Sequence, residues 1–287
     1  MSGSSPGAGR SRSSGVTLGL YIFLIATTVP FAFPFLWMLA TSLKELPQVF
    51  AYPPIWIPDP TRWANYPEAL TRVQPFGLYF RNTAVIVFWV VLGELLSASF
   101  VGYGFARIRF PGRDALFLVL LATMMIPFVV RLVPLFVIYQ KLGWINTFLP
   151  LIVPSFLGTP FLVFLMRQFY LTVPQELHDA ARIDGCSELG VWWRVFVPLS
   201  KPALAVVAVF AFQSTWNEFM APLIFLNDQS KKTVILGLYG MIGTGGATQW
   251  WNLVMAAAVT IVAPVIAVYL VSQRFMTQGI TLSGLKG

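Results

Sequence analysis

The sequence predicts an all-α integral membrane protein with six transmembrane helices. Of its 287 residues, 57% are hydrophobic and 10% are charged, whereas a soluble globular domain has roughly 25% charged residues. Apolar runs of about the 20 residues that one spanning helix needs recur along the chain. The period-2 alternation typical of an outer-membrane barrel is missing, and only helices satisfy their own backbone polar groups in lipid. We therefore expect one helical membrane domain over 16–287.

The amino terminus is predicted to be a short tail followed by the first span. Residues 1–15 are rich in Gly and Ser and carry two arginines, a composition that favours a disordered tail. The uncharged run that follows is too long for the core of a signal peptide. We therefore expect an uncleaved first helix over 16–40, despite Pro30 and Pro34.

Five further apolar runs complete the prediction. They cover residues 83–105, 115–138, 147–170, 203–225 and 252–275. Three ionisable residues, Glu94, Arg131 and Glu218, lie at membrane depth within them. Such groups are costly in lipid and are candidates for function or for structural ion pairs.

The loop "ARIRFPGRD" between the second and third spans sets the predicted orientation. It carries Arg107, Arg109 and Arg113, and basic residues in short loops concentrate on the cytoplasmic side. Placing this loop inside puts both termini in the cytoplasm. It also makes the polar segment 172–201, between the fourth and fifth spans, a cytoplasmic loop.

That cytoplasmic loop is expected to open with a short helix. Thr172 and Gln175 have capping-box spacing, with Pro174 just inside the start. The small or apolar residues Leu177, Ala180 and Ala181 recur at helical spacing, and three acids lie off this stripe: Glu176, Asp179 and Asp184.

Gly185 supplies the left-handed residue that ends such a helix. A second amphipathic segment, which contains Trp192 and Trp193, follows and stops at Pro198 and Pro202. Two alanines flanked by acids suit insertion into a groove of another protein, because small side chains permit close backbone approach. An amphipathic loop resting on lipid headgroups is the alternative, and the residues alone leave both open.

The spacing of this segment resembles the EAA loop of ABC-transporter permeases, E-A-A-x3-G-x9-I-x-L-P. The matching positions are Asp179, Ala180, Ala181, Gly185, Val195, Val197 and Pro198. The sequence departs from the family pattern in having Asp for Glu and two valines for Ile and Leu. The stretches "WMLATSLKE", "RNTAVIV", "GYGFARIRFPGRDALF", "STWNEFMAPL" and the carboxyl-terminal "QRFMTQGITLSGLKG" extend the resemblance along most of the chain.

Together these stretches resemble the second permease subunit of a binding-protein-dependent carbohydrate importer of the maltose type. The resemblance implies the type I importer fold, in which a cytoplasmic coupling helix docks in a cleft of an ATPase subunit. The residues implied for coupling are Glu176, Asp179, Ala180, Ala181, Asp184 and Gly185. Residues 278–287 are a secondary candidate for contact with the ATPase.

The resemblance also implies the partners and the location. They are a homologous second permease, two cytoplasmic ATPase subunits and an extracytoplasmic solute-binding protein, at the inner membrane of a prokaryote. ATP and Mg are expected on the ATPase subunits, with no cofactor or metal on this chain. The sequence contains no Gly-Lys dipeptide and hence no P-loop phosphate cradle. We expect contact with lipid and none with nucleic acid.

A solute pathway is expected near Trp216, Asn217 and Glu218, whose ring, amide and carboxylate suit stacking on and hydrogen bonding to a sugar. For Glu94 and Arg131 we expect an ion pair that joins the second and third spans. The solute is expected to be a sugar or sugar derivative; a non-sugar solute such as a glycerol-phosphate ester is the alternative.

Two other functional classes remain as rivals. A membrane-embedded enzyme would need a base with a nucleophile or metal ligands at depth. The only histidine, His178, is expected on the surface of the cytoplasmic helix, and the only cysteine, Cys186, is expected to be a small buried residue. A passive channel is the second rival, but it would leave the docking motif without a use.

Overall fold

The computed structural model describes residues 14–243 and 247–283, and every regular element in those ranges is a helix. Four helical runs are long and apolar enough to cross a membrane, and two sharply bent helix pairs raise the number to six if each pair counts as one span. The four are α1 (Ser14–Ser42), α4 (Phe76–Arg107), the run Leu149–Thr172 and the greater part of α15 (Ala247–Ser283). The predicted all-α fold class is confirmed, and the predicted six spans equal the upper count. Residues 1–13, most of the predicted tail, lie outside the described residues.

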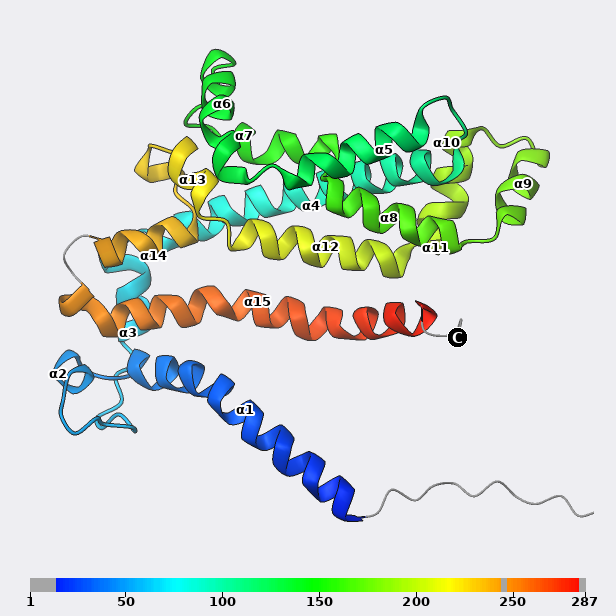
Figure 1. Ribbon diagram of the computed structural model, residues 1–287. Coiled ribbons are helices and arrows are strands. Elements are labelled where there is room, and N and C mark those ends of the chain that lie inside the picture. The colour runs from blue at the N-terminus through cyan, green and yellow to red at the C-terminus, as the bar shows by residue number, and fades with distance from the viewer. Residues whose placement is uncertain (1–13, 244–246, 284–287) are drawn as a thin grey trace, which may run out of the picture.

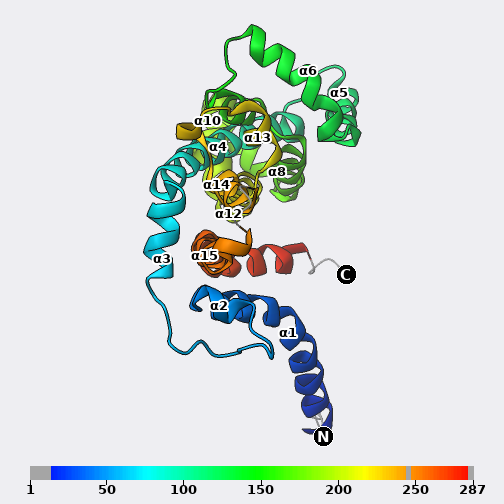
Figure 2. The same ribbon diagram turned by 90° about the vertical axis from the view of Figure 1, so that its left-hand side faces the viewer.

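The centre of the bundle is α4, which packs against α8 (Pro160–Thr172), α12 (Lys201–Trp216) and α14 (Val234–Gly243) (Figures 1 and 2). Small residues allow the closest of these contacts. A Cβ placed on Gly102 would lie 2.8 Å from the Cβ of Met166 on α8. The backbones of α4 and α8 therefore approach each other more closely than any larger residue at 102 would permit.

The first span packs on the last one at the edge of the bundle. No side chain from Leu18 to Ala40 is buried, and α1 contacts α15 (Figure 2). Beyond α1, the short helices α2 (Leu46–Val49), α3 (Asn65–Glu68) and η1 (Ala69–Val73) precede α4. The side-chain amides of Asn65 and Asn252 both donate to the carbonyl of Lys44, at 2.8 and 3.2 Å, and so tie the end of α1 to α15.

The third predicted span, over 115–138, is sharply bent. Residues 113–141 form α5 (Arg113–Ala122), η2 (Thr123–Met125) and α6 (Phe128–Lys141), which are bent by 100° at one short break. Ile126 takes φ −82° and ψ 112° at the break. A residue before proline is pushed out of the helical region by the proline ring, so Pro127 ends the first arm.

The fourth and fifth predicted spans are also interrupted. The fourth consists of α7 (Leu149–Ile152), η3 (Val153–Leu157) and α8, with Gly158 at φ +90° between the last two. The predicted helix over 203–225 stops at the end of α12, and α13 (Met220–Phe225) begins after a three-residue break. The Glu218 carboxylate accepts from the backbone N–H of Ala221 at 3.0 Å, satisfying a backbone donor in the first turn of α13. A 3-10 turn, η5 (Gln229–Lys231), leads on to α14.

The loop between α8 and α12 forms one end of the molecule. It contains α9 (Gln175–Ile183), α10 (Glu188–Val191), the π-helical turn η4 (Trp192–Phe196) and α11 (Val197–Leu199). The described end of α15 and the start of α1 point toward this end, and α13 and α14 lie toward the opposite end (Figure 1). Which end faces the cytoplasm stays a prediction.

Candidate functional site

The helix α9 projects from the end of the bundle and exposes an apolar and acidic surface (Figure 1). Leu177 and Ile183 are 43% and 85% exposed, and Ala180 is exposed beside them. Each of the three predicted acids, Glu176, Asp179 and Asp184, is exposed as well. Only two residues of α9, His178 and Ala181, are buried. The predicted stripe is therefore divided, because Ala181 faces the bundle while Leu177 and Ala180 face outward.

The start of α9 differs from the predicted capping box. Pro174 is the N-cap residue, and no side chain caps the helix. The Thr172 hydroxyl donates to the carbonyl of Phe169 in α8 instead, at 2.7 Å. Gln175 donates to Asp179 at 3.0 Å, one turn along α9. Hydrogen bonds from Gln175 and His178 lower the pKa of Asp179, which keeps this exposed acid charged.

The predicted glycine turn at the end of α9 is confirmed. Gly185 has φ +85°, in the left-handed region that glycine adopts without a steric penalty. The N–H of Cys186 donates to Ala181 O at 3.0 Å, and the N–H of Gly185 donates to Arg182 O at 3.1 Å. These two hydrogen bonds form a Schellman motif, which satisfies the last carbonyls of the helix. The motif fixes the angle at which the chain turns from α9 into α10.

His178 is a buried connector rather than the predicted surface residue. It is 8% exposed, and its Nε2 lies 3.2 Å from Oε2 of Glu188 on α10. The same carboxylate accepts from the Tyr103 hydroxyl of α4 at 2.8 Å and lies 3.4 Å from the Arg182 guanidinium. Burial alone would raise the pKa of Glu188, but the hydrogen bonds from Tyr103 and His178 outweigh it and lower the pKa. Glu188 therefore joins α9, α10 and α4 as a charged acceptor.

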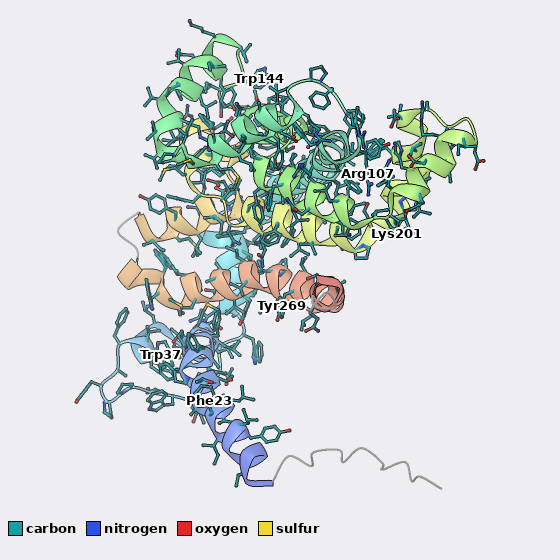
Figure 3. All side chains as sticks on the ribbon, turned by 45° about the vertical axis from the view of Figure 1, so that its right-hand side comes forward. Phe23, Trp37, Arg107, Trp144, Lys201 and Tyr269 are labelled. Carbon is teal, nitrogen blue, oxygen red and sulfur yellow. The ribbon has the colours of Figure 1, made fainter. Side chains whose placement is uncertain are left out.

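Arg107, at the last turn of α4, holds the other end of α9. Its guanidinium donates to the side-chain oxygen of Gln175 at 2.6 Å and to the carbonyls of Tyr170 and Val173. The same group lies 5.1 Å from the ring centre of Phe196 in η4. Figure 3 shows Arg107 at the junction between the bundle and the loop that carries α9. The sequence indicated Arg107 only as a topology signal, because its partners lie 63 to 68 residues away along the chain.

A buried polar network lies beneath α9, near the ends of α4, α8 and α12 and in η4. The indole N–H of Trp192 donates to the Ser99 hydroxyl at 3.0 Å, and that hydroxyl lies 2.7 Å from the Tyr170 hydroxyl. The Tyr170 hydroxyl also lies 3.4 Å from the Ser200 hydroxyl. The network therefore joins α4, α8, η4 and the start of α12 through buried hydrogen bonds, which hold these elements together.

The predicted ion pair between Glu94 and Arg131 is not formed. The Glu94 carboxyl is 5% exposed and accepts from the hydroxyl and the backbone N–H of Thr159. The Arg131 guanidinium lies 5.7 Å from the ring centre of Phe128. The bend at Pro127 carries α6 away from the line of α5, which separates the two charges.

The three residues predicted for a solute pathway have different surroundings. Trp216 is 6% exposed, stacks on Phe212 and donates to the carbonyl of Ile261 at 3.1 Å, so it is a packing residue and offers no face to a sugar. Asn217 is exposed and donates to the carbonyl of Gln213. Glu218 lines a cavity of about 290 Å³.

The described residues contain no group of three or more His, Cys, Asp or Glu side chains placed to hold a metal ion. Cys186 is a half-buried free thiol. The main feature of this region is an exposed helix, α9, that is attached to the ends of spanning helices through Arg107, Tyr103 and His178.

Comparisons with known proteins identify the family of the chain. Residues 95–282 match the family of binding-protein-dependent transport system inner membrane components. The sn-glycerol-3-phosphate transport system permease protein of Yersinia enterocolitica is 32% identical, with 93% of this chain and 96% of the relative aligned. The arabinooligosaccharides transport system permease protein of Halalkalibacterium halodurans is 33% identical, over 89% of this chain and 91% of the relative.

The fold agrees as well. A crystal structure of a bacterial ABC transporter involved in the import of the acidic polysaccharide alginate contains a chain that superimposes with a TM-score of 0.79. That chain is 23% identical, and the match covers 94% of this chain and 99% of the other. The chain has the permease fold of ABC importers and belongs to the family of binding-protein-dependent transport system inner membrane components.

Proposed function

We propose that this chain is the permease subunit of an ATP-driven importer of sugars or sugar derivatives, and that α9 is its coupling helix. The exposed surface of α9 carries the proposal. Leu177, Ala180 and Ile183 offer apolar contact area to a cleft, and the flanking acids favour a basic rim. The relative named for arabinooligosaccharide transport supports a sugar as the solute, and the relative named for sn-glycerol-3-phosphate transport supports the alternative of a glycerol-phosphate ester.

Coupling follows from how α9 is held. When the two ATPase subunits close on ATP and Mg, the helix docked in a cleft of one subunit moves with that subunit. Glu188 and Arg107 bond α9 and its loop to α4, and the network around Trp192 joins η4 to α8 and α12. The loop therefore moves with the spanning helices. The spans then rearrange between outward-open and inward-open states, the kind of rigid-body switching by which an effector site drives a distant one.

The proposed assembly contains a second, homologous permease, two ATPase subunits in the cytoplasm and an external solute-binding protein. We place the chain in the inner membrane of a prokaryote with both termini in the cytoplasm. ATP hydrolysis belongs to the ATPase subunits. Residues 278–283 continue α15 toward the end where α9 lies, and 284–287, the rest of the proposed secondary contact, lie outside the described residues.

Charge reversal tests the acidic docking surface. The two acids chosen are exposed, and their side chains take no part in the hydrogen bonds that fasten α9. In the assembled complex, the double substitution Glu176→Lys with Asp184→Lys should reduce copurification of the ATPase subunits at least severalfold. It should also abolish stimulation of ATP hydrolysis by the loaded binding protein, because both charges would then repel a basic rim. The control is Glu45→Lys, a half-buried acid between the end of α1 and the start of α2, away from α9.

Unchanged assembly together with unchanged stimulation in the double variant would contradict the docking role of α9. Solute uptake that continues at full rate without ATPase subunits would favour the passive channel instead.

A further inference from the structure

A cavity at membrane depth brings together residues that no sequence pattern links. It is about 290 Å³ in volume and is formed by one face of α4, the breaks around α7 and α8, and the junction of α12 with α13. Both Glu94 and Glu218 line it, although they are far apart in the chain. Its lining residues include no Lys, Arg or His.

The two carboxyl groups are held with acceptor positions left for a ligand. Thr159 donates to both oxygens of Glu94, through its hydroxyl to Oε1 and through its N–H to Oε2 at 3.4 Å. Ala221 donates to Oε1 of Glu218. Each carboxylate oxygen can accept about two hydrogen bonds, so both groups retain acceptor capacity.

A third group in the lining lacks a partner. Thr233 is 5% exposed, and its buried hydroxyl makes no hydrogen bond within the described residues. An unsatisfied buried hydroxyl destabilises the protein, and a polar ligand in the cavity removes that penalty. Ser214 and Thr215, two further hydroxyl-bearing residues, line the same cavity.

We propose that this cavity is a subsite for the transported solute and that it selects an uncharged or cationic polyhydroxy compound over an anionic one. Solute hydroxyls donate to the two carboxyl groups, in hydrogen bonds that a charged acceptor strengthens. A phosphate or carboxylate in the cavity would meet two acids and no base among the described lining residues, and like charges placed together disfavour binding. The inference rests on the proposed function. The proposal predicts that this chain does not transport glycerol-phosphate esters.

Charge selectivity of the cavity can be measured without knowing the natural solute. In the complete importer carrying Cys186→Ala, the variant Thr215→Cys places one thiol in the cavity. Its reaction rate is compared for a cationic and an anionic methanethiosulfonate reagent, normalised to Glu45→Cys outside the cavity. We expect at least tenfold preference for the cation, which should fall severalfold when Glu94→Gln and Glu218→Gln are added. A normalised ratio near one, or one that the two glutamines leave unchanged, overturns the proposal.

Solute contact is tested on the same variant with two probes. Arabinotriose should slow labelling of Thr215→Cys at millimolar concentration, whereas sn-glycerol-3-phosphate should not. Protection by the phosphate ester equal to or greater than that by the trisaccharide overturns the assignment, and so does protection by neither. Stimulation of ATP hydrolysis is measured in parallel, so that failure of the proposed function can be told from failure of the cavity proposal. Loss of stimulation after charge reversal on α9 tests the proposed function. The labelling ratio tests only the cavity.

Discussion

At the residue scale, Gly185 forms the turn that ends α9, and His178 meets the Glu188 carboxylate that also accepts from Tyr103 of α4. Gly185 was predictable because a left-handed turn is a local property and glycine is the residue that adopts it freely. The connector role of His178 was not, since it depends on Glu188, ten residues away, and on Tyr103 in α4. A lone histidine on a short polar helix carries no signal of the carboxylate that its ring meets in the fold.

Gly185→Val gives a prediction at the scale of one residue. No neighbour lies within 4 Å of a Cβ at this position, so the cost is the strained backbone alone, about 1–3 kcal/mol. Relief of that strain would turn α9 away from its docking angle. We expect normal membrane insertion but a loss of ATPase stimulation of tenfold or more.

Gly143→Val is the matched control for this experiment. Gly143 also has a positive φ, +68°, and open space around it, but it follows α6 rather than α9. It should bear a similar backbone penalty and retain coupling. Equal coupling in the two variants would mean that the Gly185 turn does not set the position of α9.

At the scale of whole elements, the breaks in the spanning helices shape the fold and the cavity. The pattern of apolar runs predicted the spans, but proline and polar residues inside those runs decided where each helix is interrupted. Pro127 bends the third predicted span by 100°, and Glu218 lies in the break that ends the fifth. The breaks at Thr159 and Glu218 form part of the wall of the cavity, because an uninterrupted helix would present neither the Glu218 carboxylate nor the Thr159 N–H to its interior.

The contact between α4 and α8 gives a prediction for packing. Gly102→Ala would place a Cβ 2.8 Å from Met166, and such overpacking costs about 1–3 kcal/mol. Gly104→Ala, two residues along, meets no atom within 4 Å and should be neutral or slightly stabilising, since alanine favours a helix by about 1 kcal/mol over glycine. Thermal unfolding in detergent should show a lower midpoint only for Gly102→Ala. Equal unfolding midpoints for the two variants would mean that α4 and α8 accommodate a methyl group at position 102 without loss of stability.

For the whole molecule, the arrangement places α9 at one end and the α6–α7 connection toward the other (Figure 1). The excess of arginine around α9 predicts that its end faces the cytoplasm. Asp184 and Lys141, one near each end, are both exposed and provide positions for a topological test.

Thiol labelling in a Cys186→Ser background tests this orientation. A membrane-impermeant maleimide should label Lys141→Cys in intact cells and Asp184→Cys only in inverted vesicles, and both after permeabilisation. Labelling of Asp184→Cys from outside would reverse the predicted topology, and α9 could then not meet a cytoplasmic ATPase.

The sequence by itself determined the membrane class, the positions of the apolar runs, the acidic helix and its glycine turn. These follow from composition, from periodicity and from local backbone preference, all of which act over a few neighbouring residues. The tertiary structure alone decided that Glu94 meets Thr159 instead of Arg131, that Trp216 is enclosed by packing, and that Arg107 fastens the loop of α9. These contacts join residues 45 to 68 positions apart, and their geometry depends on where prolines and glycines bend and pack the spans.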